Sequence, residues 1–65
     1  MRIRVNGQTL EVEAPTLERL LDELGYGEKT VATAVNQEFV RNKDRGETLL
    51  IEDDAVEIVT PRQGG

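Results

Sequence analysis

The sequence predicts a single α+β domain in which one helix packs across a mixed sheet of four or five strands. Its 65 residues leave room for one domain only. It contains no cysteine, so regular packing has to support the small core without disulfides. Its hydrophobic pattern alternates at the N-terminus, changes to helical spacing, and then returns to short β-branched runs. This order of patterns is typical of a helix covering a sheet.

Residues 2–13 have the pattern of a β-hairpin. Asn6-Gly7 separates two alternating runs, and both residues tolerate the positive φ of a type I′ turn. A two-residue loop places Val5 opposite Gln8. In this register the apolar residues share one face, and side chains of opposite charge lie across from each other on the second face. Turn type, alternation and charge therefore favour the same register.

The next segment has the signals of a short amphipathic helix over residues 17–24. Pro15 ends the preceding strand, and Thr16 has a side chain suited to an N-cap. Four leucines follow at i, i+3, i+4 and i+7, and Gly25 stands where helices often end in a left-handed residue. Because so short a helix is unstable alone, we expect its leucine stripe to cover the hairpin rather than a partner.

Short strands and turns are expected in the rest of the domain, which we predict to span residues 1–60, with a flexible tail over 61–65. Ala32 and Ala34 suit a central strand that the helix crosses closely. The expected strands are at 31–35, 39–41, 48–51 and 55–60, with an irregular loop or helical turn at 42–47.

The composition excludes most catalytic chemistry. The chain has no histidine and no cysteine, which removes the commonest general base, the commonest metal ligand and a thiol nucleophile. The acidic run at 52–54 lacks the ligand spacing of a calcium loop, and we interpret it as a solvated turn. We expect no catalytic residue, no metal site and no cofactor bound by the chain itself.

The formal net charge of −5 argues against nucleic acid, because the basic residues are too few and too scattered to follow a phosphate backbone. An acidic surface favours solubility or a basic protein partner. The sequence has no run of roughly 20 apolar residues that would span a bilayer, and its start lacks the apolar stretch of a signal peptide. We expect a cytoplasmic protein that binds no membrane and is a monomer when free.

The sequence ends in Gly64-Gly65. Glycine has no Cβ, so a diglycine backbone fits a channel too narrow for side chains. Pro61 ends the pairing of the last strand, and five extended residues reach roughly 16–18 Å. We therefore expect Gly64 and Gly65 to enter a partner's active site, with a merely frayed terminus as the alternative.

In their order and spacing, these segments resemble the ThiS-type sulfur carriers of thiamine biosynthesis, within the β-grasp, ubiquitin-like superfamily. The resemblance covers essentially the whole chain. Members often carry Asp-Gly-Asp before the last strand, where this chain has Glu-Asp-Asp, which questions the geometry of that turn. The motifs are VNGQ at 5–8, T-L-x-x-L-L-x-x-L-G at 16–25, V-A-x-A-V-N at 31–36, D-x-V-E-I-V-x-P at 54–61 and the terminal diglycine.

This resemblance implies a β-grasp fold and a carrier that is a protein co-substrate, not an enzyme. The carboxylate of Gly65 would be adenylated with ATP by an E1-like adenylyltransferase of the ThiF type. Sulfur from a donor such as a cysteine desulfurase would then replace AMP to give a thiocarboxylate. A thiazole synthase of the ThiG type would use that sulfur for the thiazole ring. ATP would belong to the activating partner.

Two other functions stay open at this point. The chain resembles carriers of other sulfur pathways, namely molybdopterin formation, tRNA thiolation and cysteine synthesis. Those relatives are usually longer, and the molybdopterin type often has a more apolar stretch than 61–63 before its diglycine. A ubiquitin-like interaction or modifier domain is the second alternative.

Partner docking is predicted at Arg62, Val59 and Phe39, with Arg62 facing an acidic channel and Tyr26 as a further docking candidate. The alternative is that the apolar members of this set complete the small core, and for Phe39 we favour the core.

Overall fold

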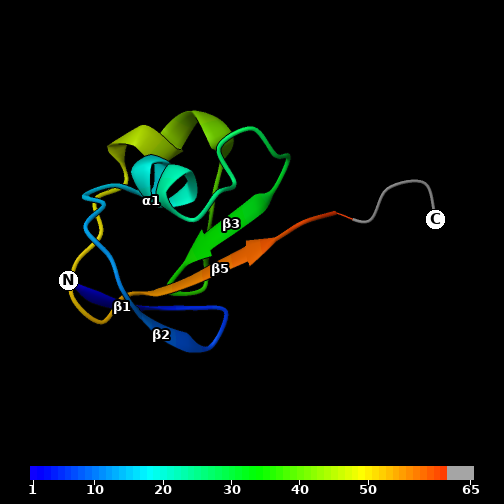
Figure 1. Cartoon of the computed structure of the whole chain (residues 1–65). Coiled ribbons are helices and arrows are strands. Elements are labelled where there is room, and N and C mark those ends of the chain that lie inside the picture. The colour runs from blue at the N-terminus through cyan, green and yellow to red at the C-terminus, as the bar shows by residue number, and fades with distance from the viewer. Residues whose placement is uncertain (62–65) are drawn as a thin grey trace.

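One helix crosses one face of a five-stranded sheet in the computed structural model, which describes residues 1–61 (Figure 1). The strands lie in the order β2-β1-β5-β3-β4. The predicted architecture is therefore confirmed. The elements are β1 (Arg2–Val5), β2 (Gln8–Glu11), α1 (Leu17–Glu23), β3 (Ala32–Val35), β4 (Glu38–Val40), the 3₁₀ helix η1 (Asn42–Glu47) and β5 (Ala55–Val59).

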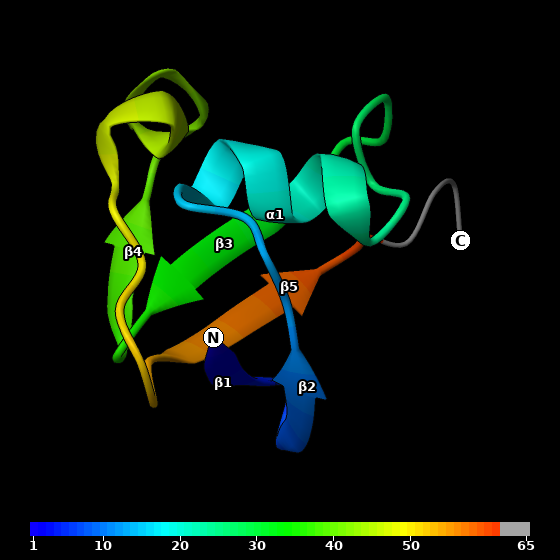
Figure 2. The ribbon, with the colours of Figure 1, turned by 60° about the vertical axis from the view of Figure 1, so that its left-hand side comes forward.

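Strand β5 is the last in the sequence and lies in the middle of the sheet. It pairs in parallel with β1 and antiparallel with β3. The other two pairs, β1 with β2 and β3 with β4, are antiparallel hairpins. The two halves of the sheet are thus joined through β5, and α1 lies over the same face of β3 and β5 (Figure 2).

The N-terminal hairpin has the predicted register. Val5 pairs with Gln8 and Arg2 with Glu11. Both turn residues have positive φ, 51° at Asn6 and 84° at Gly7, as a type I′ turn requires. The observed register and turn confirm the hairpin prediction. The sequence could predict them because the signals lie within a few residues of the turn.

Helix α1 begins and ends where its signals predict, within one residue. The Thr16 hydroxyl accepts a hydrogen bond from the Arg19 N–H at 3.2 Å, which caps the helix N-terminus. Gly25 follows the helix with φ 89°. The leucine stripe faces the sheet, as expected. Over residues 1–61, none of the helices has the length and apolar character needed to cross a bilayer.

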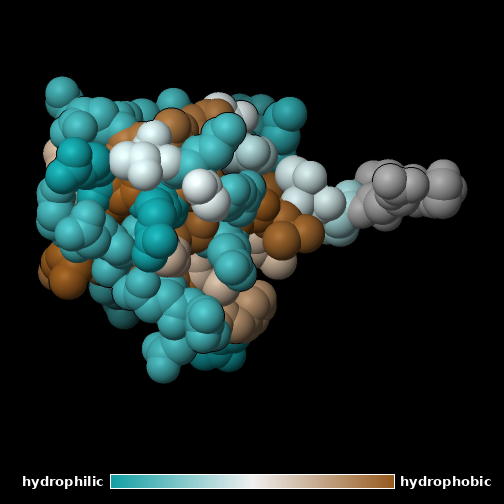
Figure 3. Space-filling model, turned by 90° about the horizontal axis from the view of Figure 1, so that it is seen from below, coloured by the Kyte–Doolittle hydropathy of each residue, from teal (hydrophilic) through white to brown (hydrophobic). Residues whose placement is uncertain are grey.

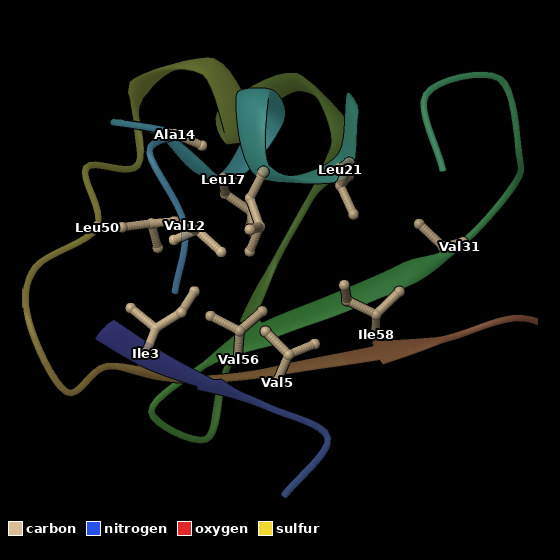
Figure 4. Close-up of a cluster of buried hydrophobic side chains, with 11 residues drawn as sticks. Ile3, Val5, Val12, Ala14, Leu17, Leu21, Val31, Leu50, Val56 and Ile58 are labelled. Carbon is tan, nitrogen blue, oxygen red and sulfur yellow. The ribbon is translucent and has the colours of Figure 1, made fainter. Parts of the chain in front are cut away.

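The core lies between α1 and the sheet. Figure 4 shows side chains of β1 and β5 pointing up toward leucines that point down from the helix. Val12 and Leu50 fill the same space from outside these elements. The buried hydrophobic residues are Ile3, Val5, Val12, Ala14, Leu17, Leu20, Leu21, Val31, Leu50, Val56 and Ile58.

The alanines of β3 face away from the helix, so the expectation that the helix crosses them closely is wrong. Thr33 pairs with Ile58 and is 2% exposed, so it occupies the inner face. Its hydroxyl donates to the Val40 carbonyl and accepts from the Arg45 guanidinium. Because strand side chains alternate, the alanines on either side of Thr33 take the outer face.

Residues 48–51 do not form a strand of the sheet, contrary to the prediction. This segment pairs with the start of α1 instead, through an isolated bridge between Thr16 and Leu49. The Leu50 N–H donates to the Pro15 carbonyl at 3.0 Å, and the Leu50 side chain enters the core. The buried side chain of Leu50 anchors the segment, while the side chains of Leu49 and Ile51 on either side of it stay exposed.

The acidic turn at 52–54 is not uniformly solvated, so that interpretation is wrong for Asp54. Asp54 is 6% exposed and accepts hydrogen bonds from the Asn36 side-chain amide and the Ile51 N–H, both at 2.9 Å. Asp53 stands where the resembling family often has glycine, and it has φ 72°. The turn keeps a left-handed geometry without its glycine, which Asp tolerates better than most residues.

The two hairpin turns supply a matched stability test. The β3–β4 turn repeats the first turn, with φ 52° at Asn36 and 73° at Gln37, but it has glutamine where the first turn has Gly7. We predict that Gln37→Gly raises the free energy of unfolding by roughly 0.5–1 kcal/mol, because the cost of a left-handed side chain exceeds the extra entropy of glycine. Urea denaturation measures this change.

The reverse substitution is the control. A Cβ at Gly7 would meet no atom within 4 Å, so Gly7→Gln tests the backbone alone. It should lower stability by a similar amount. Equal stability of both variants and the parent chain would contradict the left-handed geometry of these turns.

Candidate functional site

The predicted tail begins where β5 leaves the sheet. Ile58 points into the core and is 5% exposed, whereas Pro61, three residues later, is exposed. Figure 1 shows the chain leading away from the sheet at this end. Arg62, Gly64 and Gly65, for which docking, partner entry and modification were predicted, lie outside the described residues. The described part of the site is therefore the exit up to Pro61 and the surface around it.

Phe39 and Val59 lie on the outer face of the sheet, at the end of β5. Strand β3 brings them together, because Ala32 pairs with Val59 and Ala34 pairs with Phe39. Phe39 is 68% exposed and Val59 is 60% exposed. The expectation that Phe39 completes the core is wrong. Its neighbour in β4 takes the inner position opposite Thr33, which leaves Phe39 on the outside.

A shallow hollow lies between these two side chains. Its floor is low because the alanine side chains of β3 end at Cβ, while Phe39 and Val59 rise above it. Glu57 brings a negative charge into the lining. Figure 3 shows hydrophobic atoms beside the point where the chain leaves the globular body. The lining residues are Ala32, Thr33, Ala34, Phe39, Glu57 and Val59, and we call this surface the exit face.

The other half of the outer face is charged. Arg2 lies 3.9 Å from the Glu52 carboxylate, and the N-terminal ammonium lies 3.3 Å from Glu11. Arg4, on the same side of β1, is exposed. The outer face is thus divided into a charged region on β1 and β2 and an apolar region on β3, β4 and the end of β5. Exposed apolar surface rimmed by polar residues commonly marks a site of protein association.

Tyr26 is not part of the exit face. It follows α1, where its N–H donates to the Leu21 carbonyl at 2.7 Å, and its side chain packs partly buried against the core. Of the two roles left open for Tyr26, the core role is the one that the structure shows.

Sequence reasoning missed two exposed apolar residues. Leu49 is 72% exposed and Ile51 is 66% exposed, and both line a second hollow that shares Phe39 with the exit face. A run of three apolar residues around Leu50 gave no sign of which one enters the core. Alternation along an extended segment predicts that Leu49 and Ile51 are exposed only once Leu50 is known to be buried.

Among residues 1–61, no group of three or more carboxylates, histidines or cysteines is placed to hold a metal ion. The buried side-chain nitrogen and oxygen atoms of this part of the chain all have hydrogen-bond partners. What the described residues offer is an apolar surface next to a strand exit. Such an arrangement suits docking to another protein.

A family model described as the ThiS family matches residues 3–65 of this chain. A relative from Thermus thermophilus, described as sulfur carrier protein ThiS, is 34% identical over 61 residues. The alignment covers 94% of this chain and 95% of the relative.

Solved structures agree with this match. A crystal structure of a thiamine biosynthesis protein (ThiS) from Geobacter metallireducens has a TM-score of 0.81 and 29% identity, with both chains fully covered. An NMR structure of a thiamine biosynthesis protein from the same organism has a TM-score of 0.80 and 26% identity, over all of this chain and 88% of the other. The expected β-grasp fold is confirmed.

The exposure of the exit face predicts that its apolar residues add little to stability. Val59→Thr keeps the side-chain shape and adds a hydroxyl on the surface, so the free energy of unfolding should change by less than about 0.5 kcal/mol. Val56→Thr makes the same chemical change in the core and should cost roughly 1–3 kcal/mol, because it buries a hydroxyl. Equal losses in urea denaturation of the two variants would contradict the exposed position of Val59.

Proposed function

The chain belongs to the ThiS family, and on this basis we propose that it is a sulfur carrier protein for thiamine biosynthesis. The observation that carries the proposal is the family match over residues 3–65, which runs through the terminal diglycine. The name of the Thermus thermophilus relative and those of the Geobacter metallireducens structures favour the thiamine pathway over the other sulfur pathways left open by the sequence.

In this proposal the reacting group is the α-carboxylate of Gly65. An E1-like adenylyltransferase of the ThiF type joins a carboxylate oxygen to the α-phosphorus of ATP, and pyrophosphate leaves. The acyl adenylate has a good leaving group, so the terminal sulfur of a persulfide on a donor such as a cysteine desulfurase attacks the acyl carbon and displaces AMP. A thiol then reduces the sulfur–sulfur bond of this acyl disulfide and forms a disulfide on the donor side, which leaves the thiocarboxylate on Gly65. The resulting thiocarboxylate passes its sulfur to a thiazole synthase of the ThiG type.

The composition supports a carrier rather than an enzyme. The chain has no cysteine that could hold sulfur as a persulfide and no histidine that could act as a general base. The proposal therefore assigns ATP binding and acid–base chemistry to the partners. This chain contributes its terminal carboxylate and a surface that the partners bind.

The exit face is the surface that we assign to docking. Exposed aromatic and aliphatic side chains over a low floor give a partner an apolar anchor. The position of Val59 places this anchor two residues before Pro61, so a partner that binds the face also receives the chain that leaves it. We keep the prediction that Arg62 contacts an acidic channel of the partner.

Intact-mass spectrometry tests the carrier function. After incubation with the organism's adenylyltransferase, ATP and a sulfur donor, we predict that the chain exchanges one oxygen for one sulfur, and that fragmentation places the sulfur on Gly65. Deletion of Gly65 should abolish the exchange while leaving the urea midpoint unchanged, because the core ends before Pro61.

Two results would contradict this function. An unchanged mass of the full chain under these conditions would exclude thiocarboxylate formation by this route. Recovery of the chain joined to lysines of other proteins would support a modifier function instead.

Steady-state kinetics of adenylation test the docking surface. Phe39→Thr places another residue of high strand propensity in β4 but removes the aromatic anchor, so we predict that KM for the carrier rises roughly tenfold with kcat nearly unchanged. Thr9→Ala removes an exposed side chain from the charged half of the same outer face and serves as the control. Equal effects of the two substitutions would contradict docking at the exit face.

A further inference from the structure

The backbone groups of β5 that face β1 continue one step past the end of β1. In the parallel pair of these strands, the Arg4 N–H donates to the Asp54 carbonyl and the Asn6 N–H donates to the Val56 carbonyl, both at 2.9 Å. Strand β1 then turns away at Asn6. The next groups of β5 on this side, the N–H and C=O of Ile58, have no peptide of β1 opposite them.

The side chain of Asn6 takes the place of that missing peptide. Its Oδ1 accepts a hydrogen bond from the Ile58 N–H at 2.9 Å, and its Nδ2 donates to the Ile58 carbonyl at 3.1 Å. A side-chain amide has the same donor and acceptor as a peptide group, so it continues the ladder by one step. This explains asparagine at the position, because aspartate lacks the donor and glycine lacks the side chain.

A second asparagine holds the opposite end of β5. Asn36 occupies the same position in the β3–β4 turn, with nearly the same φ of 52°. Its Oδ1 accepts from the Ala55 N–H at 3.0 Å, and its Nδ2 donates to the Asp54 carboxylate at 2.9 Å. Each hairpin turn therefore supplies one left-handed asparagine, and the two side chains bind the first and the last part of the central strand.

We propose that Asn6 is a positioning residue for the reactive terminus, an inference that rests on the proposed sulfur-carrier function. On the β1 side, Asn6 makes the last hydrogen bonds to β5 found among residues 1–61, and the chain leaves the sheet three residues later. Asn6 holds Ile58 on the β1 side and Ala32 pairs with Val59 on the β3 side, so Asn6 is one of the two contacts that set the direction in which the chain runs to Pro61 past the exit face.

The length of chain beyond Ile58 makes this direction matter. Seven residues follow Ile58, up to and including Gly65, and a chain of that length reaches at most roughly 23–25 Å when extended. A shift of the chain at Pro61 would therefore move the whole region that Gly65 can reach relative to the docked exit face. A misplacement of about 1 Å at a reacting group is enough to cost a factor of about 100 in rate. Docking at the exit face alone does not prevent such a shift.

The two asparagines form a matched pair for the test. Asn6→Gly and Asn36→Gly both keep a residue that accepts the left-handed turn, and each removes two side-chain hydrogen bonds to β5 or the turn before it. We expect Asn6→Gly to lower kcat for adenylation by about tenfold or more with KM within about twofold, because docking persists while the carboxylate is misplaced. We expect Asn36→Gly to leave kcat unchanged.

Two further measurements separate positioning from stability. Amide hydrogen exchange at Ile58 should be faster in Asn6→Gly than in Asn36→Gly, at a temperature where urea denaturation shows both variants folded. Asn6→Asp keeps the turn and the acceptor for the Ile58 N–H but loses the donor, so it should also lower kcat. This variant provides the test if Asn6→Gly does not fold.

Unchanged kcat in both Asn6 variants would overturn the positioning role, as would an equal loss in Asn36→Gly or an effect confined to KM. These outcomes leave the carrier function intact as long as the parent chain is adenylated. If the parent chain itself is not adenylated by the partner enzyme, the proposed function fails, and the positioning role fails with it.

Discussion

The placement of the last strand in the middle of the sheet is the constraint on which the rest of this structure depends. Strand β5 lies between the two hairpins, so β1 and β3 each lack one neighbouring strand until residues 55–59 are in place. Val56 and Ile58 then close the core beneath the helix. Because β5 is held on both sides, the chain that follows it starts from a fixed base even though it leaves the globular body.

The two faces of the sheet have different roles: the inner face forms the core and the outer face is exposed. The core takes most of the large aliphatic side chains, and a domain of this size has few left over. Phe39 and Val59 nevertheless remain outside, next to the exit of the chain. Leaving large apolar side chains in water gives nothing to folding, so the exposure of these two residues supports the docking role that we propose for the exit face.

Polar side chains fasten the irregular segments that connect the strands. Arg45 of η1 is buried and donates to the Val31 carbonyl at 2.7 Å and to the Thr33 hydroxyl at 3.1 Å, which ties η1 to β3. Asp54 and Asn36 join the turn before β5 to the turn after β3. With short strands and one short helix, these bonds hold the loops at positions that hydrophobic contacts alone would leave open.

The sequence by itself determined the N-terminal hairpin, the extent of the helix and the diglycine end, because Asn6-Gly7, Thr16 and Gly25 act on backbone within a few residues of themselves. Only the tertiary structure decided which face of β3 carries its alanines, that Phe39 stays outside, and that residues 48–51 pair with the start of α1. It also decided that Asn6 binds Ile58, a residue 52 positions away. The physical reason is the same in each case: the inner or outer position of a side chain depends on partners distant in the sequence, and those partners meet only when β5 enters the sheet.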